Sequence, residues 1–359
     1  MSSVLGVPLG QDGPNDLGGR WFMGWRKRWL AWLALPLVLG AASPDAGSLL
    51  EARLDAIRVW PGLLPATRPG PPRGLPRGQD WVGVGRRLFS DPRLSGSGDM
   101  SCATCHQPAH GYAEARPLAV GHRGRLLARH TPTVVDTALL SAFFWDGRAA
   151  TLADQALGPL LSPAEMAGTR EGIARVLEED PLYRKAFRAA FARGGKVEDA
   201  ALALEAYERT LVSGPSRVDR YVAGDRKALT REEKLGLFVF TGKGSCTMCH
   251  RGPALSDGAF HALGLPPLTP GASADPGRMA LTGQASDLGA FRTPPLRQVS
   301  RTPPYMHDGR FPTLEAVVEF YDRGGGPGHS PLIEPLGLSE EERRALVAFL
   351  RALDGPVRP

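Results

Sequence analysis

The sequence has few cysteines and little excess charge, and both shortages exclude classes of protein. Only four cysteines occur among 359 residues, and none is left over for a disulfide because all four belong to two copies of one pentapeptide pattern. A net charge of +6, from 43 basic and 37 acidic residues, is too small for a nucleic-acid-binding protein, so no nucleic acid partner is expected. The hydrophobic content of 42% is ordinary for a globular chain, which excludes disorder.

The chain also lacks a long run of alternating polar and apolar residues, the pattern typical of β-strands. Helices are expected instead at Trp81–Phe89, Arg170–Phe191 and Val197–Leu211, and capping boxes that begin at Thr230 and Ser339 mark two further helix starts. Glycine (44) and proline (33) together make up about a fifth of the chain, so long loops should connect the helices. We therefore expect a mainly α fold with long loops.

The N-terminus has no apolar run of the roughly 20 residues that a membrane-spanning helix needs. Basic residues 26–28 precede an apolar run, 29–39, and then four small residues, which is the layout of a secretory signal peptide. We expect residues 1–42 to direct export to the periplasm and residues 43–77 to form a lead-in rich in proline and glycine. An uncleaved membrane anchor is the alternative.

Two copies of the pattern C-x-x-C-H carry the chemistry of the chain. Two thiols on one turn add to the vinyl groups of haem, and the adjoining histidine binds the iron, so the pattern predicts c-type haem. Zinc half-sites and redox C-x-x-C motifs are alternatives, but zinc requires both halves to converge on one metal, and a redox motif needs no histidine. We expect two covalently attached haem c groups, one in each of two cytochrome c domains, 78–226 and 227–359. The predicted attachment residues and axial ligands are Cys102, Cys105, His106, Cys246, Cys249 and His250.

The residue on the opposite face of each iron separates an electron carrier from a catalyst. A carrier closes both faces, commonly with Met or His, whereas a peroxidase leaves one face open for peroxide. By spacing alone, Met306 lies 56 residues after His250 and is a candidate sixth ligand of the second haem. A role as core filler is the alternative for this methionine.

Six further segments occur in an order that resembles the bacterial dihaem cytochrome c peroxidases and their MauG-type relatives. The likeness runs from about Gly78 to Gly355. In that family the first haem is peroxidatic and the second transfers electrons, so the resemblance implies the same division here. The segments that carry it are 88–94, 144–149, 204–211, 292–297, 302–309 and 313–315.

The resemblance implies a distal pocket over the first haem formed by Gln155, Pro159 and Glu165. Peroxide cleavage needs a group that takes a proton from one oxygen and returns it to the other, and a buried carboxyl of raised pKa can do both. We expect Glu165 to be that group. Its alternative is a first-turn carboxylate that complements a helix dipole.

The same resemblance assigns roles to His122 and Trp145. His122 is similar to the distal histidine that ligates the peroxidatic iron in the oxidised resting form of the peroxidases, a ligand that MauG-type enzymes lack. Trp145 is similar to the tryptophan that carries charge between the haems. An exposed loop histidine and a core aromatic are the respective alternatives.

For the second haem, the family position of the sixth ligand falls on Tyr321. The peroxidases of the family have Met there, and Tyr is the MauG-type pattern. An anionic phenolate stabilises high oxidation states of iron, whereas a thioether favours reduction. Tyr321 thus implies a haem suited to holding an oxidising equivalent, and a simple helix-end aromatic is the alternative.

The family also binds calcium through an asparagine and two backbone carbonyls, which match Thr302 and Pro304. The asparagine position holds His130. Because calcium prefers oxygen donors, this histidine weakens the expectation of calcium.

Three functions follow from these residues. The leading one is a periplasmic dihaem peroxidase that reduces hydrogen peroxide with electrons from a small cytochrome c or cupredoxin. A MauG-type enzyme that oxidises side chains, such as Trp, of a partner protein is the alternative favoured by Tyr321. A non-catalytic dihaem electron carrier would leave Gln155, Pro159 and Glu165 without a role. Whether the protein forms a homodimer is left open, because the sequence has no long apolar stripe from which a dimer interface could be predicted.

Overall fold

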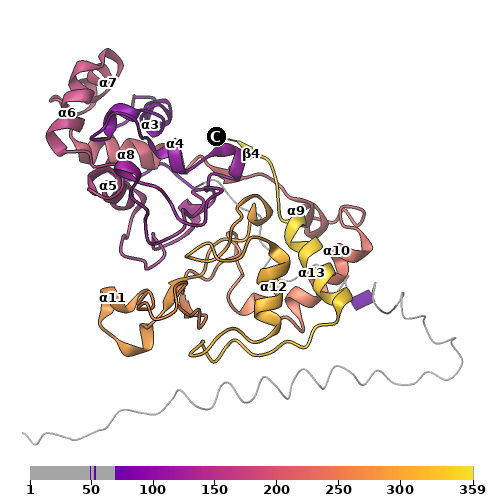
Figure 1. The fold of residues 1–359 in the computed structure, drawn as a ribbon. Helices are drawn as coiled ribbons and strands as arrows, with labels where there is room; N and C mark the ends of the chain where they lie inside the picture. Colours follow the sequence, from indigo (N-terminus) through magenta and orange to yellow (C-terminus); the bar gives the residue numbers. More distant parts are fainter. Residues whose placement is uncertain (1–48, 50–51, 54–68, 359) are drawn as a thin grey trace, which may run out of the picture. The chain divides into compact units, whose positions relative to one another are not determined.

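Helices dominate the part of the chain that the structure describes, and its strands are short (Figure 1). The computed structural model describes residues 49, 52–53 and 69–358. The predicted signal peptide and most of the predicted lead-in lie outside the described residues. Within them, no helix is both long and apolar enough to cross a membrane. The expectation of a mainly helical fold with long loops is confirmed.

The first half of the described chain packs around a helix pair. Helix α3 crosses α8, and Gly85 of α3 lies so close to Ala203 that an added Cβ would overlap the Ala203 carbonyl. Buried Leu88, Leu160 and Leu204 belong to the surrounding hydrophobic core. The helices of this half are α3 (Trp81–Phe89), α4 (Cys102–Cys105), α5 (Leu152–Leu161), α6 (Arg170–Glu179), α7 (Pro181–Phe191) and α8 (Val197–Glu208).

One helix prediction for this half is wrong. The single helix expected over Arg170–Phe191 is two helices that break at Asp180. Pro181 disfavours helical backbone at the residue before it, and Asp180 instead caps α7 by accepting hydrogen bonds from the Leu182 and Tyr183 amides. The hydrophobic spacing continues across the break, which is why periodicity alone did not reveal it.

The second half repeats the arrangement of the first. Helix α10 crosses α13, and Gly236 of α10 lies against the Ala345 carbonyl as Gly85 lies against Ala203. Both predicted capping boxes, at Thr230 and Ser339, are present. The helices are α9 (Arg217–Val222), α10 (Arg231–Thr241), α11 (Met279–Thr282), α12 (Leu314–Asp322) and α13 (Glu340–Ala352).

Two small antiparallel sheets tie distant segments together. Strand β1 (Val212–Ser213) pairs with β4 (Val357–Arg358), and β2 (Phe260–Ala262) pairs with β3 (Ala290–Arg292). In the second sheet Phe260 lies opposite Arg292 and His261 opposite Phe291. Short 3₁₀ helices occupy several loops, at Pro92–Leu94, Pro108–His110, His122–Gly124, Thr137–Leu139, Cys246–Met248, Ala285–Asp287 and Val299–Arg301.

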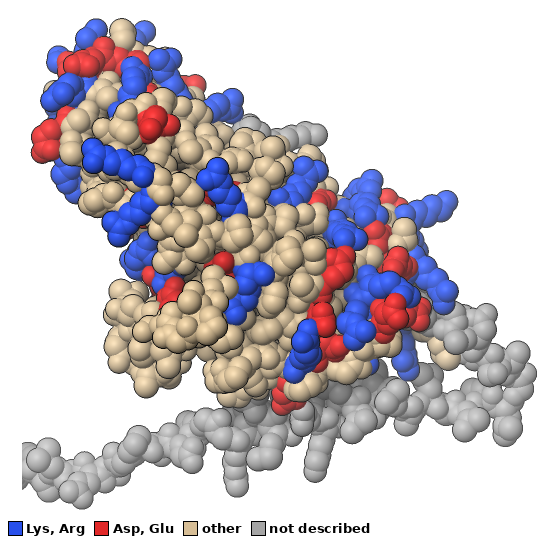
Figure 2. All heavy atoms as spheres, in the orientation of Figure 1, with Lys and Arg blue, Asp and Glu red and all other residues tan. Residues whose placement is uncertain are grey.

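The buried apolar residues form two large clusters, one from Trp81 to Leu211 and the other from Val218 to Leu353. Both clusters belong to one unit, Leu50–Pro359. Two cores are consistent with two cytochrome c domains, whose boundaries stay a prediction. On the face in Figure 2, charged side chains gather over the helices, and few appear at the lower left, where α11 lies in Figure 1.

Candidate active site

A cavity of about 1280 Å³ opens beside the first pentapeptide. This volume exceeds the roughly 300–1,000 Å³ of most small-molecule pockets, so the cavity can hold a large cofactor. Both halves of the chain line it: the first pentapeptide and α5 on one side, and loop 262–276, strand β3 and residues 307–310 on the other.

The first pentapeptide forms one turn of helix, α4, which is closed at its start by a capping box between Ser101 and Thr104. Cys102 and Cys105 therefore lie one turn apart, and His106 follows at the end of the helix. The His106 Nδ1 atom is 3.1 Å from the Tyr112 carbonyl oxygen. Because a carbonyl only accepts, Nδ1 donates, and Nε2 keeps a free lone pair for a metal.

Burial sets the protonation of this pentapeptide. Desolvation lowers the pKa of His106 to about 4, so the ring is neutral at physiological pH, which is the form that binds metals. Burial also raises the pKa of Cys102 to about 12 and that of Cys105 to about 11, so both are protonated thiols. The three side chains are thus in the states that the haem prediction requires.

The second pentapeptide repeats the histidine geometry. His250 Nδ1 lies 2.9 Å from the Leu255 carbonyl oxygen, and desolvation lowers the pKa of the ring. Burial of Tyr321 on α12 raises the pKa of its phenol, and the nearby Cys249 and Cys246 thiols raise it further. The structure therefore brings Tyr321 close to the two cysteines, as its predicted role requires, while Met306 stays an alternative ligand.

The two cysteine pairs do not form a shared zinc site within the described residues. The one group of ligand atoms found there within 4.8 Å of one another comes from Cys249, Asp257 and His261, and it contains a single cysteine. A zinc site of the predicted alternative kind needs both cysteine pairs at one metal. The geometry therefore favours the haem interpretation of the pentapeptides.

Gln155, Pro159 and Glu165 all line the cavity. Gln155 and Pro159 lie on α5, and Pro159 has no amide hydrogen to give to the Gln155 carbonyl. After α5 the chain turns back, and the Met166 amide donates to the Pro159 carbonyl at 3.1 Å. The structure thus brings together the three residues that the sequence predicted as a group.

Burial raises the pKa of Glu165, and the charge of Arg148 and a hydrogen bond with Ser162 partly offset that rise. A carboxyl with a raised pKa holds its proton more readily than an ordinary glutamate and can still release it to a neighbouring group. Glu165 therefore has the properties of a proton-transfer group. Its position on the cavity wall favours this role over that of a helix-dipole carboxylate.

His122 lies next to Glu165 through its backbone but directs its ring elsewhere. The His122 amide donates to the Glu165 carbonyl at 2.7 Å, while its Nδ1 lies 3.1 Å from the Ser97 hydroxyl. In the described part of the chain, His122 is not among the residues that line the cavity. Its role as an iron ligand stays a prediction.

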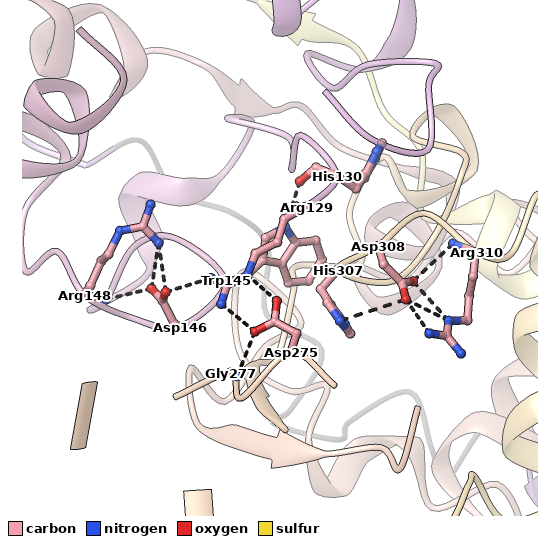
Figure 3. A network of polar contacts seen from close by, with 10 residues as sticks. All are labelled: Arg129, His130, Trp145, Asp146, Arg148, Asp275, Gly277, His307, Asp308 and Arg310. Atoms are coloured by element: carbon pink, nitrogen blue, oxygen red, sulfur yellow. Dashed lines mark hydrogen bonds and ion pairs between the residues drawn. The ribbon is translucent and has the colours of Figure 1, made fainter. Parts of the chain in front are cut away.

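Trp145 is held between the two halves of the chain (Figure 3). Its indole N–H donates to the His130 carbonyl at 2.9 Å, and its own carbonyl accepts the Arg292 amide of β3 at 2.8 Å. Beside it, Arg129 donates to Asp146 at 2.7 Å and to Asp275 at 2.8 Å. Trp145 also lines the cavity, and its role as a charge carrier between the haems stays a prediction.

The side chain of His130 is already hydrogen-bonded within the protein. Its Nδ1 lies 2.9 Å from the Arg116 carbonyl oxygen, so this nitrogen is the donor. Burial lowers the pKa of the ring. Calcium, with carbonyl ligands from Thr302 and Pro304, stays a prediction.

A family model described as di-haem cytochrome c peroxidase matches residues 79–227. The cytochrome-c peroxidase IdrP1 of Pseudomonas sp. (strain SCT) is 36% identical over 353 residues, which cover 89% of this chain and 92% of that protein. The chain belongs to the di-haem cytochrome c peroxidase family. It is thus an oxidoreductase that acts on hydrogen peroxide, as the resemblance implied.

Other relatives of this di-haem peroxidase have the MauG name. The methylamine utilization protein MauG of Methylorubrum extorquens is 41% identical over 288 residues, which cover 79% of this chain and 80% of that protein. The crystal structure of a MauG-like protein associated with microbial copper homeostasis has a TM-score of 0.74 and 31% identity, and it covers 82% of this chain and 96% of that one. Peroxidases and MauG-type proteins therefore share this fold.

Three buried polar residues at the di-haem peroxidase cavity were missed by the sequence reasoning: Glu208, Arg292 and His307. Glu208 lies four residues after Leu204, on the apolar face of α8, and a charged residue at such a position is a usable signal. Arg292 and His307 lie in loop-rich segments without periodicity, so their burial could not be read from the sequence.

The cavity fits the first of the two haem c groups that the family implies, because Cys102, Cys105 and His106 line it. Glu208 is 4% exposed and lies near Cys102, and its Oε2 has no hydrogen bond within the described residues. Burial and the neighbouring Glu205 raise the pKa of Glu208 to about 8, so this carboxyl is mostly neutral at pH 7. A neutral carboxyl beside thiols and a neutral imidazole suits the apolar edge of a macrocycle.

Proposed function

We propose that this protein is a periplasmic di-haem peroxidase that carries two covalently attached haem c groups. Cys102 and Cys105 would attach the first, with His106 as its axial ligand. The second would be held by Cys246, Cys249 and His250, with Tyr321 as its sixth ligand. The observation that carries the proposal is the cavity in which Glu165, Gln155 and Pro159 line the same space as the first pentapeptide.

Bound haem supplies the electron-transfer chemistry, and the protein supplies proton handling and orientation. Glu165 would take a proton from one peroxide oxygen and return it to the other oxygen as that oxygen departs as water. Gln155 offers an amide that can hydrogen-bond to peroxide, and Pro159 limits the space beside it. In the full reaction one hydrogen peroxide, two electrons and two protons give two waters.

The second haem would supply electrons to the first, and Trp145, which lines the cavity, would lie on this route. The reductant in this proposal is a small cytochrome c or a cupredoxin that docks outside the cell membrane. A pure electron carrier would leave the Glu165 group without a task. The N-terminal pattern of basic, apolar and small residues supports the periplasmic location.

Tyr321 supports a second candidate function, MauG-type oxidation of side chains on a partner protein. Its phenol lies near the Cys246 and Cys249 thiols in a desolvated position. A phenolate ligand disfavours reduction of iron by a high-potential donor. In that case the oxidising equivalents would pass to a protein substrate.

The deciding experiment is a visible and paramagnetic-resonance spectrum of the exported protein, as isolated and after one equivalent of hydrogen peroxide without reductant. The peroxidase would be supported if the spectrum of one haem changed with peroxide only after the other haem had been reduced. It would also require fast peroxide-dependent oxidation of a small cytochrome c. A high-spin haem beside a low-spin haem, with oxidising equivalents that persist for minutes, would support the MauG-type activity. Two haems that ignore peroxide in every state would contradict both.

A further inference from the structure

Arg292 is a buried cation that has no acidic partner among the described residues. Its residue is 4% exposed, it lies at the end of β3, and it lines the cavity. Its guanidinium makes two long hydrogen bonds to backbone carbonyls, Nε to Phe144 at 3.3 Å and Nη1 to Thr293 at 3.2 Å. Within the described residues, its Nη2 has no hydrogen bond and no carboxylate forms an ion pair with it.

A lone buried guanidinium is costly, because taking a charge out of water requires compensation by an opposite charge. Burial without an opposing charge lowers the pKa of Arg292 to about 10, so the group is still charged at neutral pH. The cavity wall thus holds a positive charge with free N–H donors. Such a group matches the geometry of a carboxylate, which accepts two parallel hydrogen bonds from a guanidinium.

Three acidic residues of the cavity pair with other arginines (Figure 3). Asp146 and Asp275 pair with Arg129 at 2.7 and 2.8 Å, and Asp308 pairs with Arg310 at 2.5 Å. Glu165 and Glu208 have raised pKa values, and neither is a cause of any shift at Arg292. Among the described residues, none of the acidic side chains that line the cavity balances Arg292, so the site is open to a bound anion.

We propose that Arg292 binds a propionate carboxylate of the haem held in this cavity. Haem c carries its propionates on the edge opposite the two thioether bonds, so a cavity with the cysteines on one wall should offer cations on another. This inference rests on the proposed haem attachment at Cys102 and Cys105. It adds to that proposal a specific anchor in the second half of the chain.

The anchor also connects the haem to Trp145. The Arg292 amide donates to the Trp145 carbonyl at 2.8 Å, and its side chain donates to Phe144, the preceding residue. A propionate on Arg292 is thereby fixed next to the segment that holds Trp145. The charge of Arg292 then affects the haem, and its backbone and side-chain hydrogen bonds hold the Trp145 segment in place.

The test compares Arg292→Gln and Arg292→Lys with the wild type in the full chain, after covalent haem has been counted by pyridine haemochrome assay. A positive charge near the iron favours the reduced state. Arg292→Gln should therefore lower the reduction equilibrium constant of one haem about tenfold, or about 59 mV for one electron. Arg292→Lys keeps the charge and should restore most of this loss, while its resonance Raman propionate-bending band still shifts because the two-pronged contact is gone.

The matched control is Arg323→Gln, because the Arg323 side chain is 69% exposed on the molecular surface. It should leave both potentials and the Raman band unchanged. Unchanged potentials and an unchanged propionate band in both Arg292 variants would overturn the inference. So would a saturable response of the wild type to added acetate that Arg292→Gln abolishes, since a free carboxylate would then be the occupant. A wild type without covalent haem would instead refute the proposed function.

Discussion

At the residue scale, burial decides whether each titratable side chain of the cavity is protonated. Desolvation keeps His106 neutral and raises the pKa of Glu165 above its ordinary value. The first effect suits the predicted metal ligand, and the second suits the predicted proton-transfer group. Both residues line the same cavity.

Replacement of Glu165 by Gln should leave both haems attached and slow the reaction with peroxide by about 10² or more, the usual share of a positioned proton-transfer group. In the wild type, Glu165 must be ionised to accept a proton. The rate should therefore fall as pH decreases through its raised pKa, at a pH above the 4.5 of an ordinary glutamate. Stopped-flow absorbance against pH measures both effects.

The control for this variant is Glu171→Gln, an exposed glutamate on α6. It should react with peroxide like the wild type. A Glu165→Gln protein with unchanged rate and pH profile would remove Glu165 from the mechanism.

Replacement of Tyr321 by Met should raise the reduction potential of the second haem, because a thioether favours the reduced iron more than a phenolate does. Redox titration followed in the visible spectrum measures the change. Tyr305→Phe is the control, since the Tyr305 hydroxyl donates to the Val299 carbonyl at 3.1 Å. A Tyr321→Met spectrum identical to that of the wild type would point to another ligand, with Met306 as the first candidate.

At the element scale, the two halves use the same device to cross their helices. Gly85 on α3 and Gly236 on α10 each let a helix backbone approach the carbonyl of an alanine on its partner. The pentapeptide follows each of these first helices in the chain. The crossing therefore positions a haem-attachment motif in both halves.

Gly85→Ala and Gly236→Ala should each destabilise the protein by about 1–3 kcal/mol, because an added methyl group overpacks a tight helix contact. Urea unfolding of each variant with its haem attached measures the change. Gly70→Ala is the control, since nothing lies within 4 Å of a Cβ there. An equal free energy of unfolding for all three variants would show that the helix pairs accommodate the added methyl group without loss of stability.

At the scale of the whole molecule, charged side chains connect the halves around Trp145 (Figure 3). Arg129 joins Asp146 of the first half to Asp275 of the second through side chains that are one-fifth exposed or less. Farther along the same surface, Arg310 holds Asp308 beside buried His307, which stacks on Phe291 at 3.7 Å. These contacts hold the segments of the two halves that line the cavity in fixed positions relative to each other.

Arg129→Gln should lower the free energy of unfolding by about 1–3 kcal/mol, because two charge-assisted hydrogen-bond partners lose their cation. It should also slow electron exchange between the haems, since loop 262–276 loses its tie to the Trp145 segment. Calorimetry and flash-induced electron transfer measure these effects. Arg170→Gln, which breaks an exposed ion pair with Glu198, should change neither the stability nor the electron-exchange rate. Equal stability and equal rates in the Arg129 and Arg170 variants would show that the Arg129 ion pairs do not connect the halves.

Much of this protein could be predicted from local sequence. Two C-x-x-C-H motifs indicate haem attachment because thioether formation and iron ligation need five consecutive residues, and helix starts depend on capping side chains three residues apart. Gln155, Pro159 and Glu165 were predicted as a group only through the family resemblance, and in the structure helix α5 and the turn after it bring them together. The break at Asp180 was missed because hydrophobic spacing continues across it.

The helical class, the two pentapeptides and the family could be predicted without a structure. Folding was needed to show which charges lie buried. Folding was also needed to show that, among the described residues, Arg292 has no acidic partner and Glu208 has an oxygen without a hydrogen bond. The reason is physical: burial, desolvation and pairing depend on residues distant in the chain, such as Phe144 beside Arg292 and Asp275 beside Arg129. A motif records the atoms that must be adjacent in sequence, whereas the cavity is made by atoms that become adjacent only on folding.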